Sequence, residues 1–147
     1  MTGYGWGRNS NDQEILWADT QFFFGGVYSI TSARELNKKY AYDLDFTAGD
    51  MKAYINGELV RQTNNTYAET QYNEMYLFAC NDKGSIQPYA GRLYSFIYQN
   101  GSTVLHNLIP AKRMSDSVIG MYDTVTKTFF TNAGTGDFIA GPEVAGL

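Results

Sequence analysis

The stretch from Gly91 to Asp123 places the strongest constraint on the fold of this chain. Two apolar runs, residues 93–98 and 104–109, flank the dipeptide Asn100-Gly101. Asn-Gly between two strand-like runs predicts a β-hairpin, because a type I′ turn needs a positive φ at both central residues. A third apolar run follows over residues 118–122. The stretch therefore predicts three consecutive β-strands.

Short strand-like segments separated by turn residues continue through the rest of the chain. We expect further strands over residues 15–17, 21–24, 27–30, 40–46, 51–55, 58–60, 75–80, 127–131 and 136–140. Asn56-Gly57 predicts a second tight hairpin, residues 81–84 a turn, and residues 61–73 a long polar loop. Residues 31–39 suit either one helical turn or a polar loop. Turn signals at this spacing predict an all-β fold, an antiparallel two-sheet β-sandwich.

Composition narrows the function classes. The 147 residues suit one domain, 1–147, with residues 1–13 irregular. A net charge of −4 argues against a nucleic-acid partner, because phosphate binding needs a basic patch. No apolar run approaches the ~20 residues of a membrane span, so we expect no membrane insertion, and no signal peptide is visible. The single cysteine, Cys80, excludes an internal disulfide and has the apolar neighbours of a buried, inert thiol.

Catalytic groups are sparse. A sandwich glycosidase needs an acid and a nucleophile about 5–9.5 Å apart, and only Asp43 and Asp45 share a strand face. Thr47 stands at the next same-face position, so we interpret the two acids as a solvated strand face and expect no enzyme. His106, the one histidine, lies in a predicted strand with no G-x-S-x-G elbow elsewhere, and we interpret it as structural.

Cofactor ligands are equally few. One histidine and one cysteine exclude the usual zinc and iron sites, and we expect no cofactor. Calcium needs several oxygen ligands, and no acidic cluster has the spacing of a dedicated calcium loop. The clusters considered are Asp43/Asp45/Asp50, Asn81/Asp82 and Asp116/Asp123.

Several short motifs resemble laminin G-like, concanavalin A-like jelly-roll domains. YAYDLDF at 40–46, followed by YINGELV at 54–60, resembles their core hairpin. The later motifs are YLFA at 76–79, GRLYSF at 91–96, LIP at 108–110, GMYD at 120–123 and FFTN at 129–132. Their order is similar to a subgroup found in surface proteins of gut bacteria and their phages. The resemblance covers roughly residues 22–141. It implies an extracellular, cell-surface or virion location, and it keeps calcium at a loop rim open as an alternative.

Two departures from that family pattern lead to predictions. Few residues precede Gly25, so we expect an N-terminal edge strand to be missing or supplied by a neighbouring chain. Relatives often carry one more residue between the positions of Phe96 and Ile97. We therefore expect a β-bulge or register change at that junction.

Aromatic residues beside amide and charged groups suggest the ligand. Sugar rings stack on Trp and Tyr, while Asn, Asp and Arg bond the hydroxyls. The candidate ligand-binding residues are Trp6, Arg8, Asn9, Asn81, Asp82 and Tyr89. The alternative is that these rings only cover the sandwich edges. We expect a non-catalytic module that binds a glycan or a surface protein. A structural assembly module, a homo-oligomer formed through an exposed sheet edge, is the other hypothesis.

Overall fold

The structure is a computed structural model of the whole chain. It describes the backbone of residues 16–18, 21–24, 27–31, 35, 38–64, 77, 79–82, 85–88, 91–141 and 145–146. Side chains are described for residues 35, 38–64, 77 and 91–141. The chain divides into two compact units, Met1–Gly91 and Arg92–Leu147, and each is described by itself. The single sandwich domain stays a prediction.

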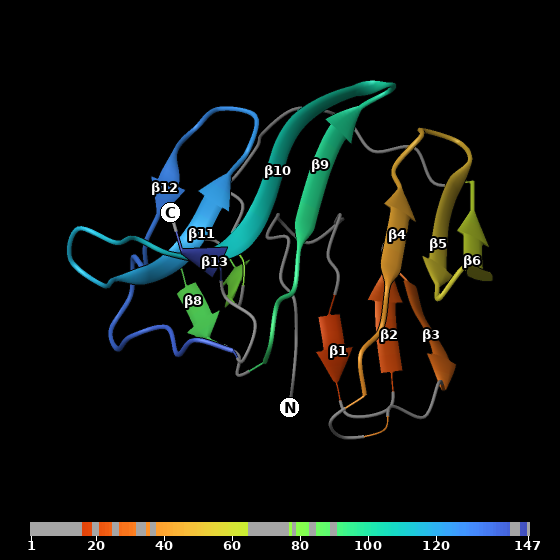
Figure 1. Cartoon of the computed structure of the whole chain (residues 1–147). Coiled ribbons are helices and arrows are strands. Elements are labelled where there is room, and N and C mark those ends of the chain that lie inside the picture. The colour runs from red at the N-terminus through yellow and green to blue at the C-terminus, as the bar shows by residue number, and fades with distance from the viewer. Residues whose placement is uncertain are drawn as a thin grey trace. The chain divides into compact units, whose positions relative to one another are not determined.

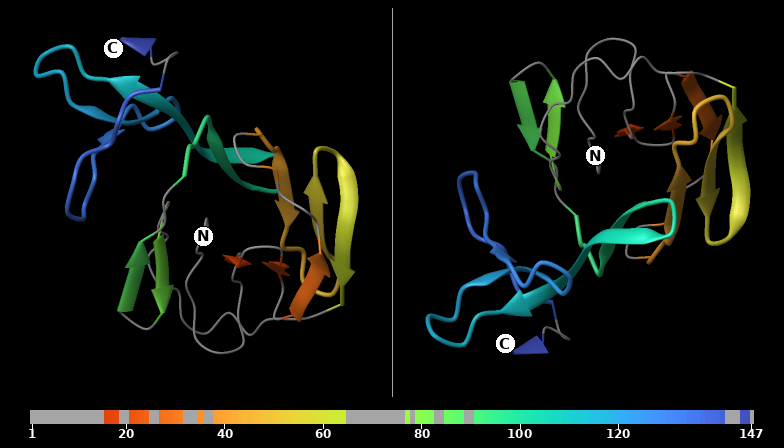
Figure 2. Two further views of the ribbon diagram at one scale, coloured as in Figure 1. Left: turned by 90° about the horizontal axis from the view of Figure 1, so that it is seen from below. Right: turned by 90° about the horizontal axis from the view of Figure 1, so that it is seen from above.

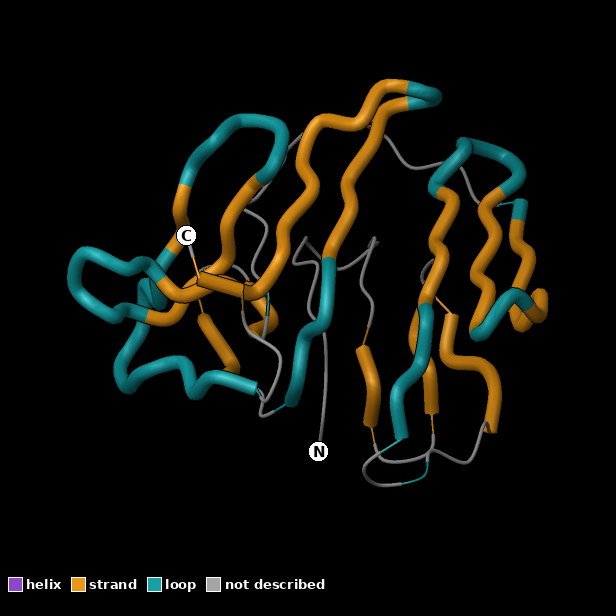
Figure 3. Tube along the Cα trace, in the orientation of Figure 1, coloured by secondary structure: helices purple, strands orange, loops and turns teal. Residues whose placement is uncertain are grey.

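The regular structure of the described residues consists of strands, without a helix (Figure 3). The all-β prediction is therefore confirmed for this part of the chain. The strands pair antiparallel in all but one case, which is compatible with a β-sandwich. Figure 1 labels most of them, with the bounds β1 Leu16–Ala18, β2 Gln21–Phe24, β3 Val27–Thr31, β4 Tyr42–Asp45, β5 Met51–Ile55, β6 Glu58–Thr63, β7 Ala79–Asp82, β8 Ser85–Pro88, β9 Phe96–Asn100, β10 Thr103–Lys112, β11 Ile119–Asp123, β12 Phe129–Phe130 and β13 Ala145–Gly146.

The described residues of the first unit form three antiparallel sheets. Strands β1, β2 and β3 form one, β4, β5 and β6 form the second, and β7 pairs with β8 in the third. The sheet β4–β5–β6 has a buried face and an outward face, because side chains alternate along each strand. Met51 and Ala53 are fully buried, and Tyr42, Leu44 and Ile55 pack against them. The predicted alternation of residues 40–46 is confirmed in β4.

The turn between β5 and β6 matches its prediction. Asn56 has φ 53° and Gly57 has φ 82°, the two positive values that a type I′ turn requires. The Asn56 side chain also fixes the turn against the start of β4, because its Oδ1 accepts from the Ala41 N–H at 2.9 Å. Asn-Gly is thus the dipeptide that this hairpin needs.

Gly57→Ala should destabilise the chain by about 1 kcal/mol, because a Cβ is disfavoured at positive φ although no atom lies within 4 Å of it. Gly57→Asn should cost less, because Asn tolerates the left-handed region better. Urea unfolding of the two variants measures the difference. Equal losses would show that backbone strain at Gly57 is not the cause.

The described residues of the second unit form one sheet, in the order β12-β11-β10-β13, with β9 also paired to β10. Strand β10 is long and carries β9 over one part and β11 over the other (Figure 1). The buried apolar residues of this sheet are Leu108 and Ala111 in β10 and Met121 in β11. The three strands predicted between residues 91 and 123 are confirmed as β9, β10 and β11.

The turn between β9 and β10 differs from the prediction. Asn100 pairs with Thr103, so the two loop residues are Gly101 and Ser102 rather than Asn100 and Gly101. Only Gly101 has a positive φ, 56°. Glycine at the first central position suits a type II′ turn, which explains how the hairpin forms one residue later.

The register irregularity also lies elsewhere. Phe96 and Ile97 keep a regular register with Leu108 and Asn107, so the bulge expected at that junction is wrong. The pairing shifts between Val104 and His106 on the partner strand. The extra residue there takes up the change of register beside the turn, where the hairpin twists.

Three further boundaries need correction. Arg61, Gln62 and Thr63 belong to β6 and not to a polar loop, because they pair with Ala53, Lys52 and Met51. Asn81 and Asp82 belong to strand β7, where they pair with β8, and not to the turn. Residues 136–140 form no strand. The Asn132 side chain accepts from Gly134 N and donates to Gly136 O, and such local bonds compete with strand pairing.

Candidate functional site

The residues predicted to bind a sugar fall largely beyond what the structure describes. Trp6, Arg8, Asn9 and Tyr89 lie outside the described residues. Asn81 and Asp82 are placed by their backbone on β7, next to Ile86 and Ser85 of β8, and their side chains are not described. The sugar site at these six residues therefore stays a prediction.

The outward face of the sheet β4–β5–β6 offers the chemistry that was expected of those residues. Its members are Asp43, Asp45, Lys52, Tyr54, Leu59 and Gln62, all pointing away from buried Met51 and Ala53. One row across the three strands is Asp43, Tyr54 and Leu59, and the next row is Asp45, Lys52 and Gln62. An aromatic ring thus stands between a carboxylate and an apolar side chain, beside an ammonium and an amide.

A bulge in β6 decides which side chains reach this face. The register shifts between Ala53, which pairs with Arg61, and Tyr54, which pairs with Leu59. Val60 is the extra residue and packs against the buried core. As a result Leu59 stays on the outward face, 47% exposed, while Arg61 stands on the face of Ala53.

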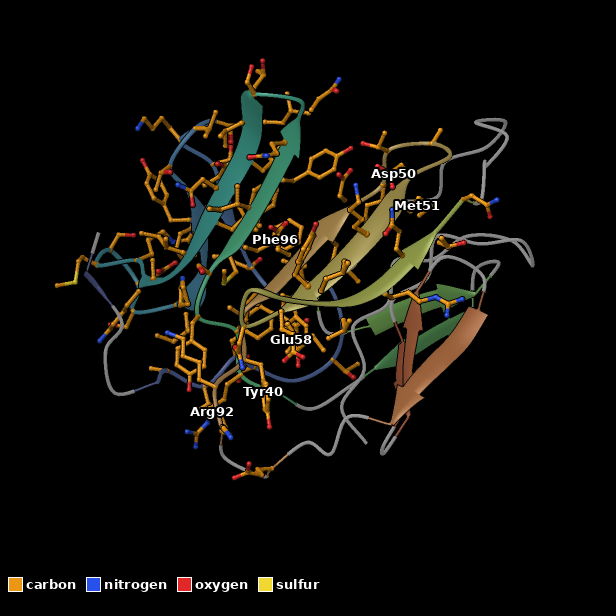
Figure 4. All side chains as sticks on the ribbon, turned by 90° about the vertical axis from the view of Figure 1, so that its right-hand side faces the viewer. Tyr40, Asp50, Met51, Glu58, Arg92 and Phe96 are labelled. Atoms are coloured by element: carbon orange, nitrogen blue, oxygen red, sulfur yellow. The ribbon has the colours of Figure 1, made fainter. Side chains whose placement is uncertain are left out.

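The end of the sheet where β5 begins carries an open hollow of about 500 Å³, lined by Gly49, Asp50, Arg61, Gln62, Thr63 and Asn64. Figure 4 labels Asp50 and Met51 at this end and Glu58 at the opposite end. Asp50 accepts from Lys52 Nζ and, at 2.7 Å, from Gln62 Nε2. These two donors lower the pKa of the Asp50 carboxyl, and Asp50 in turn raises the pKa of Lys52. Both groups are therefore charged at neutral pH and balance each other.

In the second unit, four donors converge on the fully buried carboxylate of Asp123. Its Oδ1 accepts from Asn107 N at 3.0 Å and Val125 N at 2.9 Å. Its Oδ2 accepts from His106 Nδ1 at 2.7 Å and Thr126 Oγ1 at 2.8 Å. Burial alone would raise the pKa of Asp123, but these bonds outweigh it and hold that pKa far below its usual range. Asp123 is therefore an anion, and His106 Nδ1 carries a hydrogen.

This network joins the β10–β11 hairpin to the turn that follows β11. Asp123 ends β11, His106 and Asn107 belong to β10, and Val125 and Thr126 lie in the following turn. The Tyr98 ring stacks on His106 with its centroid 6.4 Å away. The interpretation of His106 as a structural histidine therefore agrees with its contacts.

The carboxylates considered for catalysis or calcium are mostly bonded to protein groups. Asp45 accepts from the N–H and hydroxyl of Thr47, and Asp116 accepts from Arg113. Asp43 is exposed, as predicted for a solvated strand face. Across residues 38–64 and 91–141 and the other described positions, no cluster of three His, Cys, Asp or Glu could hold a metal ion.

Comparison of the chain with models of protein families, with curated proteins and with solved structures finds no match. The resemblance to laminin G-like domains therefore stays a prediction. In the described part of the chain no helix is long and apolar enough to cross a membrane.

Sequence reasoning missed the outward face and the hollow because it placed Arg61 and Gln62 in a loop. The signal that would have found them is the alternation of β5 together with the Asn56-Gly57 turn. That turn fixes the register of β6 at its start. It places Gln62 opposite Lys52 once one bulge residue is allowed.

Proposed function

We propose that the chain is a non-catalytic binding module that recognises carbohydrate, built on a jelly-roll β-sandwich of the laminin G-like, concanavalin A-like type. Such a module belongs outside the cell, on a cell surface or a virion. The observation that supports sugar binding most is the row Asp43, Tyr54 and Leu59 on the outward face. The Tyr54 ring gives a stacking surface, and the Asp43 carboxylate is exposed and able to accept from sugar hydroxyls.

The second row adds donors beside the ring. Lys52 and Gln62 are held in place by Asp50, so their positions are fixed before a ligand arrives. Prearranged polar groups around an apolar surface are typical of small-molecule sites, because less ordering is needed on binding. Asp43 and Asp45, side by side on an open face with Thr47 next, support a binding role over glycoside hydrolysis.

Tyr54→Ala should weaken the binding of any glycan that the wild-type chain captures on a glycan array by at least about tenfold, since stacking aromatics dominate such sites. Tyr94→Ala is the matched control, because Tyr94 is 50% exposed and belongs to the other unit. Unchanged binding by the Tyr54 variant would contradict the placement of the site. Failure of the wild-type chain to bind any glycan, with capture of a protein partner instead, would contradict carbohydrate as the ligand.

The alternative is a structural assembly module that binds no small ligand. Strands β4 and β6 form the two edges of their sheet in the described part of the chain. Sheet edges present backbone groups that pair with another chain. Light scattering separates the two functions, since a stable dimer or trimer favours assembly and a monomer favours the binding module.

A further inference from the structure

Arg61 is a charged residue of the hollow that has no partner among the residues that the structure describes. Its Nε is buried and has no hydrogen-bond partner. Among the residues that the structure describes, its guanidinium forms neither an ion pair nor another hydrogen bond. An arginine presents five donors in a rigid fork, and a buried donor left unpaired is costly. The position therefore lowers stability unless something else occupies it.

The carboxylate that lines the hollow does not fill this role. Asp50 lines the hollow with Arg61, but its two oxygens accept from Lys52 and Gln62. Asp50 and Arg61 are the two charged residues of the lining, and Arg61 is the one that has no bonded counterpart among the described residues. The rest of the lining is polar and uncharged, with the hydroxyl of Thr63 and the amide of Asn64. A ligand for this hollow is therefore a polar anion.

The shape of the fork selects among anions. A planar carboxylate matches two parallel N–H groups of a guanidinium, which gives short, charge-assisted bonds. The hollow adjoins the outward face through Gln62, which belongs to both. Arg61 itself stands on the opposite face of the sheet, so a saccharide that contacts both must pass around the end of the sheet where the hollow lies.

We propose that the hollow is a carboxylate subsite, with Arg61 as the anion-binding residue, and that the ligand class is an acidic saccharide such as a uronic acid. The inference rests on the proposed function for the sugar part of the ligand. The carboxylate part rests on Arg61 alone. The two can therefore fail separately.

The test follows the side-chain Nε–Hε signal of Arg61 by NMR in the full ¹⁵N-labelled chain. The probes are glucuronate and galacturonate, with glucose and galactose as neutral counterparts and inorganic sulfate as an oxyanion without a sugar. The uronates should shift the Arg61 signal saturably and bind about tenfold more tightly than the neutral sugars. Sulfate should bind more weakly than the uronates, because it lacks the sugar contacts. No Arg61 shift with either uronate, or equal affinity for uronates and neutral sugars, would overturn the proposal.

Two variants distinguish a ligand-binding role of Arg61 from a purely structural one. Arg61→Gln should abolish the preference for uronates, while Arg92→Gln, which removes an exposed charge in the other unit, should not. Arg61→Gln should also unfold at a temperature equal to or above that of the wild-type chain, because an unpaired charge is removed. A large fall in that temperature would identify Arg61 as a structural residue and overturn the subsite. If the Arg61 signal responds to uronates but Tyr54→Ala leaves sugar binding intact, the subsite stands and the outward face does not.

Discussion

Gly120→Ala should destabilise the second unit by roughly 3 kcal/mol, the largest effect expected of any small substitution in the described chain. A Cβ at Gly120 would lie 2.3 Å from the backbone oxygen of Phe130. It would also lie 2.7 and 2.8 Å from two ring atoms of Phe129. The backbone oxygen is fixed by the pairing of β11 with β12, so the clash cannot be relieved by one side-chain rotation.

The Phe129 ring has little freedom to move away. It lies across buried Gly120 on one side, and the Arg113 guanidinium stands 5.1 Å from its centroid. Urea unfolding of the full chain, followed by circular dichroism, measures the loss. Gly141→Ala is the matched control, because no atom lies within 4 Å of its added Cβ and its φ is not positive. A loss at Gly120 no greater than that at Gly141 would contradict the close packing of β11 and β12.

Asp123→Ala should give the second large loss, and a larger one than Asp123→Asn. The alanine variant leaves the N–H groups of Asn107 and Val125 and the His106 ring without their common acceptor. Asparagine keeps one oxygen, which can still accept from the two backbone N–H groups. Its amide nitrogen would then face His106 Nδ1, so the charge-assisted bond is lost and His106 keeps a bond there only by accepting through its other tautomer.

Thermal unfolding of the two variants measures these losses, and Asp116→Ala is the control. Asp116 forms its ion pair with Arg113 at the surface, where both side chains are more than two-fifths exposed, and such pairs contribute little. A fall for Asp116→Ala as large as that for Asp123→Ala would show that the buried network is not what joins the β10–β11 hairpin to the turn that follows β11.

Asp123 should also make stability depend on pH on the acid side. Because its pKa is lowered in the folded chain, its contribution is complete above the unfolded value of about 3.9 and is lost as pH falls toward the folded value. The stability difference between the wild-type chain and Asp123→Asn should therefore shrink between about pH 5 and pH 2. Urea unfolding across this range measures it. A constant difference would mean that the Asp123 carboxyl has an ordinary pKa.

Local signals predicted the parts of the fold that local chemistry determines. Asn56-Gly57 forms its turn where predicted because both residues tolerate the left-handed region. The turn predicted at Asn100-Gly101 lies one residue later, at Gly101-Ser102. Gly101 alone provides the positive φ of a type II′ turn, and the pairing of Asn100 with Thr103 adds one residue pair to the hairpin. The sequence does not decide between these turns, because the choice depends on pairing along both strands.

Long-range contacts explain what the sequence could not predict. Asp123 at the end of a strand is a typical exposed position, and its burial depends on His106 and Asn107, far back along the chain. A buried charge is tolerated only where several donors converge, which no local pattern records. Arg61 was predicted to lie in a loop for a related reason. The bulge in β6, opposite Ala53 and Tyr54, breaks the alternation of apolar and polar residues by which a strand is predicted.

The sheet β4–β5–β6, drawn from two opposite directions in Figure 2, carries the outward face on which we place the sugar. The most direct measurement is a ¹H–¹⁵N NMR titration of the full chain with the saccharide that binds best on the array. Backbone signals of Asp43, Tyr54 and Leu59 should shift together and saturate with one dissociation constant. Shifts confined to other strands, with these three signals unchanged, would contradict the claim.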